Sequence, residues 1–335
     1  MRRTTLYLLA LTLAATSLAA CSDEREALTI YSGRTENLVG PILERFHEET
    51  GIPIEVKYGD SAELALLIGT EGDRTPADVF LSQTPGANAY LAGNDLLATL
   101  PAELTEPIDE RFVDDHRLWV GVTGRQRVLV YNQDLVDSAD LPTTVDELVS
   151  EPFAGRVAVA PQNGSFQDFV TAMRQLRGDE AALEWLGALA ESGAPTYPNN
   201  NAIVEAVGRG EVPMGLVNHY YNHRFLAEEP GLPSRNHYLD GEDIGSLLIP
   251  STVSVLTASD RTEDAQRFIE FLLSEEAQRY FAEETFEYPL VAGVEPAADV
   301  PPLATIEAFP YQFSELGGGL ERTAELIRES GLGAS

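Results

Sequence analysis

The chain has 335 residues and a formal net charge of −32 at pH 7, because 54 aspartates and glutamates outnumber 22 lysines and arginines. Nucleic acids bind to clustered positive charge, so we expect no nucleic-acid partner. The single cysteine, Cys21, leaves no partner for an internal disulfide, and the length is sufficient for two domains.

Residues 1–20 have the pattern of a secretory signal peptide. Arg2 and Arg3 precede an apolar run that is shorter than the about 20 residues of a membrane-spanning helix. The run ends in Leu18-Ala19-Ala20-Cys21, which resembles a bacterial lipobox and implies cleavage before Cys21 and acylation of its thiol. Residues 21–26 would then tether a lipid-anchored protein in the periplasm or on the outer face of the cell membrane. The alternative is an unmodified cysteine in a discarded leader.

After the leader, strands and helices alternate along the chain. The first series is a strand at 27–32, a helix at 38–46, a strand at 54–58, a helix at 63–68 capped by Ser61, and a strand at 77–81. This order predicts a parallel, doubly wound sheet, whose ligands bind at the carboxyl ends of the strands.

A second α/β series follows the first. It comprises strands at 128–131, 157–160 and 214–217, a helix ending at 177, and helices at 180–190 and 202–208. A strand at 253–256 and a helix at 264–273 return to the first domain, and a helix at 320–331 closes the chain. The ends of the first strands carry no nucleotide-binding fingerprint.

Tyr220 and Tyr221 are adjacent in a segment that also holds two histidines, an arginine and two asparagines. Neighbouring side chains diverge in a strand and in a helix, so two adjacent phenols reach one small target only from a loop or a distorted element end. A bound cation keeps a phenol ionised, and ferric iron is a hard ion that favours anionic oxygen. The alternative is a pair of half-buried aromatic rings with hydrated hydroxyls.

Several segments, in order, resemble the ferric-iron-binding proteins of bacterial ABC importers over about residues 27–330. They are Tyr31-Ser32-Gly33-Arg34, Pro76-Ala77-Asp78-Val79-Phe80, Gly124-Arg125-Gln126-Arg127-Val128, Asn163-Gly164-Ser165-Phe166, Tyr197-Pro198-Asn199-Asn200, Asn218-His219-Tyr220-Tyr221 and Thr285-Phe286-Glu287-Tyr288-Pro289-Leu290. The resemblance implies an α/β, two-lobed periplasmic-binding-protein fold of type II. Each lobe would have a mostly parallel sheet flanked by helices, with hinge strands near 124–127 and 250–255. Lobe 1 would comprise 27–124 with 252–300, and lobe 2 would comprise 125–251 with 301–335.

The same resemblance assigns site residues. Tyr220 and Tyr221 match paired phenolate ligands of the metal. Six further residues match positions that hold a synergistic anion, such as carbonate or phosphate, in the family. They are Arg125, Asn163, Gly164, Ser165, Asn200 and Asn218. Independently, the Asn163–Ser165 segment at a helix start offers free N–H groups to an anion. We expect only one of Arg125 and its neighbour Arg127 to face the cleft, and the alternative for each is a hinge salt bridge.

The first lobe departs from the family pattern. Thr35 stands where many members have a histidine, Gln83 where many have a glutamate, and Phe166 where some have a third tyrosine. We therefore regard Gln83 and the nearest carboxylate, Glu36, as candidate metal ligands, with an anion or water completing the shell. The alternative for Glu36 is a solvated charge favoured by the helix dipole.

The resemblance implies a monomeric solute-binding lipoprotein that carries ferric iron to the permease of an ABC importer. Alternative solutes are an oxyanion, thiamine or a polyamine. His219 and His223, spaced i and i+4, would bind zinc if they lay on one helix face. We do not expect an enzyme, because the serines lack a nucleophile-elbow motif and the histidines lack a zinc-protease motif.

Overall fold

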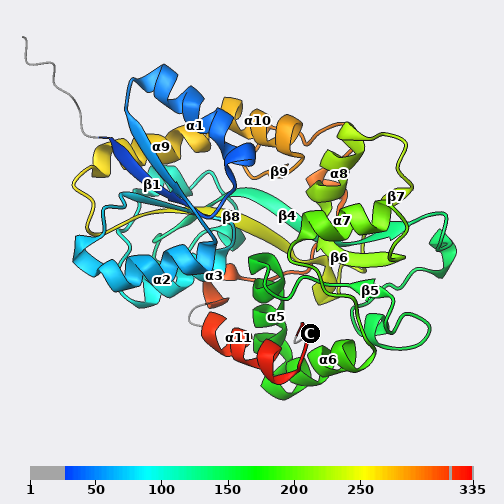
Figure 1. Cartoon of the computed structure of the whole chain (residues 1–335). Helices are drawn as coiled ribbons and strands as arrows, with labels where there is room; N and C mark the ends of the chain where they lie inside the picture. The colour runs from blue at the N-terminus through cyan, green and yellow to red at the C-terminus, as the bar shows by residue number, and fades with distance from the viewer. Residues whose placement is uncertain (1–26, 317–318, 334–335) are drawn as a thin grey trace, which may run out of the picture.

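The computed structural model describes residues 27–316 and 319–333, which form two lobes joined by two long strands (Figure 1). These strands are β4 (Val120–Asn132) and β8 (Leu248–Val255), and they pair with each other in antiparallel orientation. The strand order across both lobes is β2-β1-β3-β8-β4-β6-β5. The prediction of a two-lobed α/β fold is confirmed.

The first lobe, at the left of Figure 1, begins with a parallel sheet. Its strands are β1 (Leu28–Ser32), β2 (Ile54–Tyr58) and β3 (Val79–Ser82), and β1 pairs in parallel with both others. β3 pairs with β8 in antiparallel orientation. The helices of this lobe are α1 (Glu36–Thr50), α2 (Ser61–Glu71), α3 (Pro85–Gly93), α4 (Ala102–Thr105), α9 (Thr262–Leu272) and α10 (Glu275–Thr285), followed by the short strand β9 (Tyr288–Pro289).

Local sequence explains where these helices begin and end. α1 buries Val39, Ile42 and Phe46 at helical spacing and ends at Gly51, whose φ of 67° lies in the left-handed region that glycine tolerates. The prediction that Ser61 caps α2 is wrong, because the carboxylate of Asp60 accepts the hydrogen bonds from the N–H groups of the first turn.

The second lobe is built on the far half of β4. Its other strands are β5 (Val157–Ala158), β6 (Met214–Asn218) and β7 (Ser234–His237). β4 pairs in antiparallel orientation with β6 and β7, and β5 and β6 are parallel. The prediction of a mostly parallel sheet is therefore wrong for this lobe. A run of buried aliphatic residues fits a strand of either direction, so the pattern did not determine the direction.

The helices of the second lobe lie at the right and below in Figure 1. They are α5 (Gly164–Arg177), α6 (Asp179–Glu191), α7 (Asn200–Gly208), α8 (His219–Glu228) and α11 (Leu320–Glu329). α11 packs on α5 and α6, and the hydroxyls of Thr171 and Thr323 are 2.6 Å apart. Short 3-10 helices occur at Gly72–Arg74, Glu110–Phe112, Ser138–Asp140, Glu147–Val149, Ile244–Ser246, Leu303–Thr305 and Phe313–Leu316.

The predicted signal peptide at 1–20, the tether at 21–26 and the lipidated Cys21 lie outside the described residues. Within 27–316 and 319–333, no helix is long and apolar enough to span a bilayer.

Candidate metal centre

The two tyrosines lie at an abrupt junction between a strand and a helix. β6 ends at Asn218 and α8 begins at His219, so Tyr220 and Tyr221 belong to the first helical turn. Their rings stack with centroids 4.0 Å apart and an interplanar angle of 29°. Tyr220 is fully buried and Tyr221 is 8% exposed. The pair is therefore a single compact unit held at the start of a helix, with both hydroxyls on the same short segment.

The two hydroxyls have different surroundings. The Tyr220 hydroxyl is buried and has no hydrogen-bond partner among the described residues. The Tyr221 hydroxyl accepts a 3.4 Å hydrogen bond from the amide of Gln83, which comes from the first lobe. A buried hydroxyl without a partner is costly, so the Tyr220 oxygen is suited to a ligand.

Burial also determines the protonation of the pair. It raises the pKa of Tyr220 well above its ordinary value, and a charge on Tyr221 raises that pKa further, while Arg34 and Arg125 lower it. In the absence of a cation the Tyr220 phenol is thus neutral. A bound trivalent ion would reverse this balance and displace the phenol proton.

The structure brings most of the predicted anion-binding residues into one hydrogen-bonded cluster beside the tyrosines. Arg127 donates hydrogen bonds to the Asn218 side-chain oxygen at 3.1 Å and to the Ser165 hydroxyl at 3.4 Å. The Ser165 hydroxyl donates to the Asn163 side-chain oxygen at 2.6 Å, and the Asn200 amide donates to the same oxygen at 3.4 Å. We call these five residues the polar cluster.

The polar cluster keeps several buried atoms free. Three of its side-chain atoms have no hydrogen-bond partner in the described part of the chain. They are the Nδ2 of Asn218, the Oδ1 of Asn200 and the Nε of Arg127. Gly164, the first residue of α5, lies next to this cluster in sequence, and a Cβ built on it would be 3.7 Å from the Thr84 side chain of the first lobe. The cluster therefore fits a small polar ligand between the lobes.

Arg125 and Arg127 are both fully buried on the same face of β4, because residues two apart in a strand point the same way. The shared strand face does not decide which side chain reaches the cleft, so the expectation that only one of them faces it stays a prediction. Arg125 donates to the Pro250 carbonyl oxygen at 2.9 Å, and its Nε and Nη1 are unpartnered among the described residues. Burial lowers the pKa of Arg127 to about 9, a charge on Tyr221 raises it, and Arg125 lowers it. Neither arginine forms a salt bridge within the described residues, which contradicts the hinge salt-bridge alternative.

The first-lobe candidates lie in different places. Gln83 reaches Tyr221, as described above. Glu36 is exposed in the first turn of α1, and its side chain lies beside Gly40 and influences the pKa of Tyr58. No described hydrogen bond joins Glu36 to the tyrosines, so its position matches the solvated helix-start alternative. Thr35 is exposed as well.

The first lobe contains a buried ion pair that was not predicted from the sequence. Arg34 and Glu287 are almost fully buried and form a 2.8 Å salt bridge. Glu287 also accepts hydrogen bonds from the hydroxyls of Thr123 and Thr285. Burial alone would lower the pKa of Arg34, but the charges of Glu287 and of both tyrosines raise it above its ordinary value. Both residues lie in segments that resemble the ferric-iron-binding proteins, and this resemblance was the one sign in the sequence that they belong near the site.

Histidines do not form a metal site here. The Nδ1 of His219 accepts a hydrogen bond from the Gln126 N–H at 3.1 Å, and its Nε2 lies 2.8 Å from the Phe286 carbonyl oxygen. Burial and His223 lower the pKa of His219 to about 3, so the ring is neutral. The zinc alternative is wrong, because both ring nitrogens of His219 are already engaged. The described residues contain no group of three or more histidine, cysteine, aspartate or glutamate side chains that could hold a metal.

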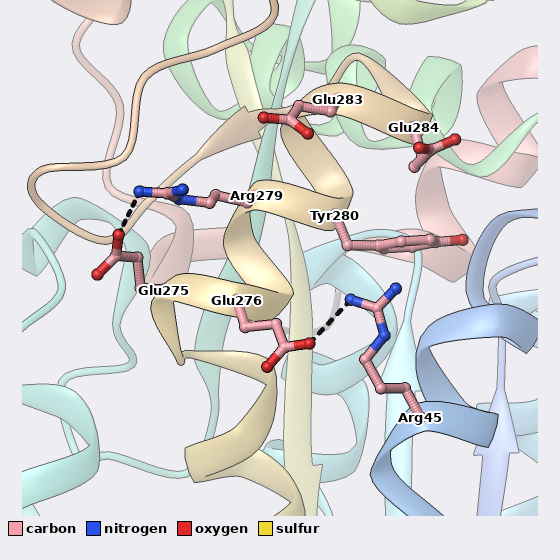
Figure 2. A pocket seen from close by; sticks show the side chains of 7 residues that line it. All are labelled: Arg45, Glu275, Glu276, Arg279, Tyr280, Glu283 and Glu284. Carbon is pink, nitrogen blue, oxygen red and sulfur yellow. Dashed lines mark hydrogen bonds and ion pairs between the residues drawn. The ribbon is translucent and has the colours of Figure 1, made fainter. Parts of the chain in front are cut away.

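A surface pocket between α1 and α10 is a separate feature (Figure 2). Two ion pairs occupy it, Arg45 with Glu276 at 3.1 Å and Arg279 with Glu275 at 2.5 Å. All four of these side chains are at least 40% exposed, so water solvates their charges. None of the tyrosines or polar-cluster residues lines this pocket, and we do not assign the solute site to it.

Comparison with known proteins identifies the family of this chain. A family model described as bacterial extracellular solute-binding protein matches residues 74–312. The major ferric iron-binding protein of Neisseria meningitidis is 32% identical over 324 residues, covering 96% of this chain and 97% of that protein. The chain belongs to the ferric-iron substrate-binding protein family. The Fe(3+)-binding periplasmic protein of Serratia marcescens is 30% identical and covers 94% of this chain and 92% of its own length.

Solved structures confirm the fold. Iron-bound HitA from Pseudomonas aeruginosa matches with a TM-score of 0.87 and 33% identity, over 91% of this chain and 99% of that structure. A Trichodesmium protein in complex with iron and citrate matches with a TM-score of 0.79 and 25% identity, over 91% and 99%. These relatives are binding proteins.

Proposed function

We propose that this protein captures ferric iron together with a synergistic anion between its two lobes and delivers it to an ABC importer. The observation that carries the proposal is the stacked, buried pair of Tyr220 and Tyr221, in which the Tyr220 hydroxyl has no hydrogen-bond partner within the described part of the chain. The ferric iron-binding relatives support the same solute.

The neighbouring residues suggest how capture proceeds. Binding of Fe³⁺ displaces the phenol protons, and the two phenolates supply anionic oxygens from the second lobe. Carbonate or phosphate fills further coordination positions and is held by the polar cluster, with Arg127 providing a charge-assisted hydrogen bond. Gln83 then approaches from the first lobe and completes the enclosure.

The proposed location of the protein is outside the cytoplasm. Cleavage before Cys21 and acylation of its thiol would anchor the protein to the membrane, where a permease partner receives the iron. Mass spectrometry of the protein from native membranes should show a lipid-modified N-terminus beginning at Cys21. An intact 1–20 leader, or an unmodified form recovered from those membranes, would contradict this part of the proposal.

The decisive experiment replaces each phenol by a ring of the same volume. In Tyr220→Phe and Tyr221→Phe, we expect the visible absorbance of the ferric complex to disappear or shift strongly. Ferric affinity should fall more than tenfold, which corresponds to about 1.4 kcal/mol. If the rings served packing alone, loss of a hydroxyl would cost only about 1 kcal/mol of stability and would leave the absorbance unchanged.

Tyr131→Phe is the matched control, because Tyr131 is also buried in the second lobe but lies outside the stacked pair. Its ferric complex should match that of the parent in colour and affinity. If both variants of the pair bind ferric iron like the parent, the iron-clamp mechanism is wrong. The oxyanion and organic-solute alternatives would then be tested with the same proteins.

A further inference from the structure

Asp168 is a buried carboxylate that crosses from one lobe to the other. It lies on α5 of the second lobe, one helical turn after Gly164, and it is 2% exposed. Its carboxylate accepts a 3.3 Å hydrogen bond from the N–H of Gly86, near the start of α3 in the first lobe. The Thr84 side chain also hydrogen-bonds to it. The contact thus joins the helices that follow β5 and β3.

The close approach depends on a glycine. A Cβ placed on Gly86 would lie 2.5 Å from the Asp168 Oδ1, a separation that real Cβ atoms do not show. Gly86 does not have a positive φ, so the backbone conformation does not explain the choice of residue. The absence of a side chain therefore permits α3 and α5 to meet at this point.

Among the described residues, the Asp168 carboxylate has no cationic partner at contact distance, because none of the salt bridges includes it. The side chain is nevertheless almost fully buried, at 2% exposure. Burying a lone charge is expensive, whereas a neutral carboxylic acid retains its hydrogen bonds to a backbone N–H and a hydroxyl. This environment favours the protonated form while the lobes are together.

We propose that Asp168 positions the two lobes in the closed state as a neutral acid, so that closure around the solute takes up a proton at this residue. The proposal rests on the proposed function, because closure is what retains the iron. Asp168 does not touch the solute in this scheme. It acts by seating α3 against α5, which fixes where Gln83 meets Tyr221.

The direction of the pH effect follows from burial. In the closed state, burial raises the pKa of Asp168 to about 7, and the charge of Asp60 raises it as well. The hydrogen bonds from Gly86 and Thr84 and the charge of Arg125 lower this pKa, but their effect is smaller than that of burial. An open cleft would hydrate the carboxyl and return its pKa to the ordinary value of an aspartate, 3.8. At a pH between these two pKa values, the closed state therefore binds one proton more than the open state. Closure is stabilised on the acid side, and this stabilisation is lost as pH rises through about 7.

The first test counts the protons released when ferric nitrilotriacetate is added to the parent protein and to Asp168→Asn. At about pH 6, the variant should release about one proton more per iron than the parent, because it cannot take one up. At about pH 9 the two should release the same number. Asp140→Asn, an exposed carboxylate of the same lobe, is the control and should behave like the parent.

A second test uses shape and needs no iron. Scattering of the metal-free parent should show a smaller radius of gyration at about pH 5.5 than at about pH 8.5, whereas Asp168→Asn should be equally compact at both. Gly86→Ala should weaken ferric binding at least threefold without moving the visible band. Gly93→Ala, in the same helix with open space around it, should bind like the parent.

The outcomes separate this inference from the proposed function. Equal proton release by the parent and Asp168→Asn at about pH 6 would overturn the role of Asp168 and leave the iron site intact. Gly86→Ala binding as tightly as Gly93→Ala would do the same. A parent protein with no coloured ferric complex would instead refute the proposed function, and the scattering comparison would still decide the closure mechanism.

Discussion

The two sides of the cleft contribute in opposite ways. The second lobe presents two phenols and a polar cluster in which several buried atoms have no hydrogen-bond partner among residues 27–316 and 319–333. The first lobe presents the neutral amide of Gln83, while its buried charges, Arg34 and Glu287, neutralise each other. The second lobe therefore offers unpartnered polar atoms beside two phenols, whereas the buried charges of the first lobe are paired with each other.

This asymmetry suggests an order of events. If the proposed site is right, its anionic oxygens all come from one lobe, so iron would load while the cleft is open and no charge from the opposite lobe would be required. The first lobe would then exclude water and hold the closed state through contacts such as Gln83 with Tyr221 and Gly86 with Asp168. Variants on the two sides should accordingly differ in what they disturb.

The largest expected effect falls on stability. Glu287→Ala would leave Arg34 buried without a partner, which should lower the free energy of unfolding by about 3–5 kcal/mol. Urea unfolding monitored by circular dichroism measures this change. Glu276→Ala removes the exposed partner of Arg45 and should cost at most about 1 kcal/mol. If the two variants were equally stable, the first lobe would not depend on its internal charge balance.

The next effect tests the second lobe. Arg127→Met removes the hydrogen bonds to Asn218 and Ser165 and should weaken ferric binding in the presence of phosphate more than tenfold, or about 1.4 kcal/mol. Competition with citrate, followed by visible absorbance, provides the affinity. Arg328→Met, an exposed arginine on α11, is the control and should have no effect. If Arg127→Met binds ferric iron with the affinity of the parent, the polar cluster does not hold the anion.

A smaller effect should appear as a gain. Gln83→Glu places an anionic oxygen beside Tyr221 from the first lobe, and a hard trivalent cation favours such a ligand. We expect several-fold tighter ferric binding and a shifted visible band. Gln133→Glu adds the same charge at an exposed position of the second lobe and should leave both unchanged. Equal behaviour of the two variants would show that the first lobe does not reach the metal.

The smallest effect is expected at Glu36. Because this carboxylate is exposed and lies beside Gly40 rather than the tyrosines, Glu36→Gln should change ferric affinity by less than about twofold. A loss comparable to that of a single tyrosine variant would place Glu36 among the ligands. The first lobe would then contribute an anionic oxygen after all, and the asymmetry between the two sides would not hold.

Sequence patterns predicted the elements that carry strong periodicity or aliphatic runs. The strands β1, β2 and β6 and the helix α5 lie close to where they were expected. The strand predicted at 128–131 is shorter than β4. The prediction missed residues 120–127 because Thr123, Arg125 and Arg127 interrupt the apolar pattern there. These polar residues are buried, and Arg127 belongs to the polar cluster, so the departure from a core-strand pattern coincides with the candidate site.

The contacts between distant segments could not be predicted in the same way. Arg34 with Glu287 and Asp168 with Gly86 are pairs separated by 253 and 82 residues. Each partner has an ordinary local context, and only the packing of the two lobes makes the pair buried. The tyrosine pair was recognisable because its adjacency is unusual by itself, whereas a lone buried carboxylate on a helix has no such local sign.

The continuity of β4 has a mechanical consequence. This strand belongs to both sheets, and its pairing with β8 is irregular between Gly121 and Thr123. Turning one lobe relative to the other is then torsion of an uninterrupted strand, and an irregularity of this kind already bends and twists the backbone. Arg125 and Arg127 lie a few residues along the same strand. If the proposed site and the closure of the lobes are both right, two of the solute-binding residues lie on the same strand that twists when the cleft closes.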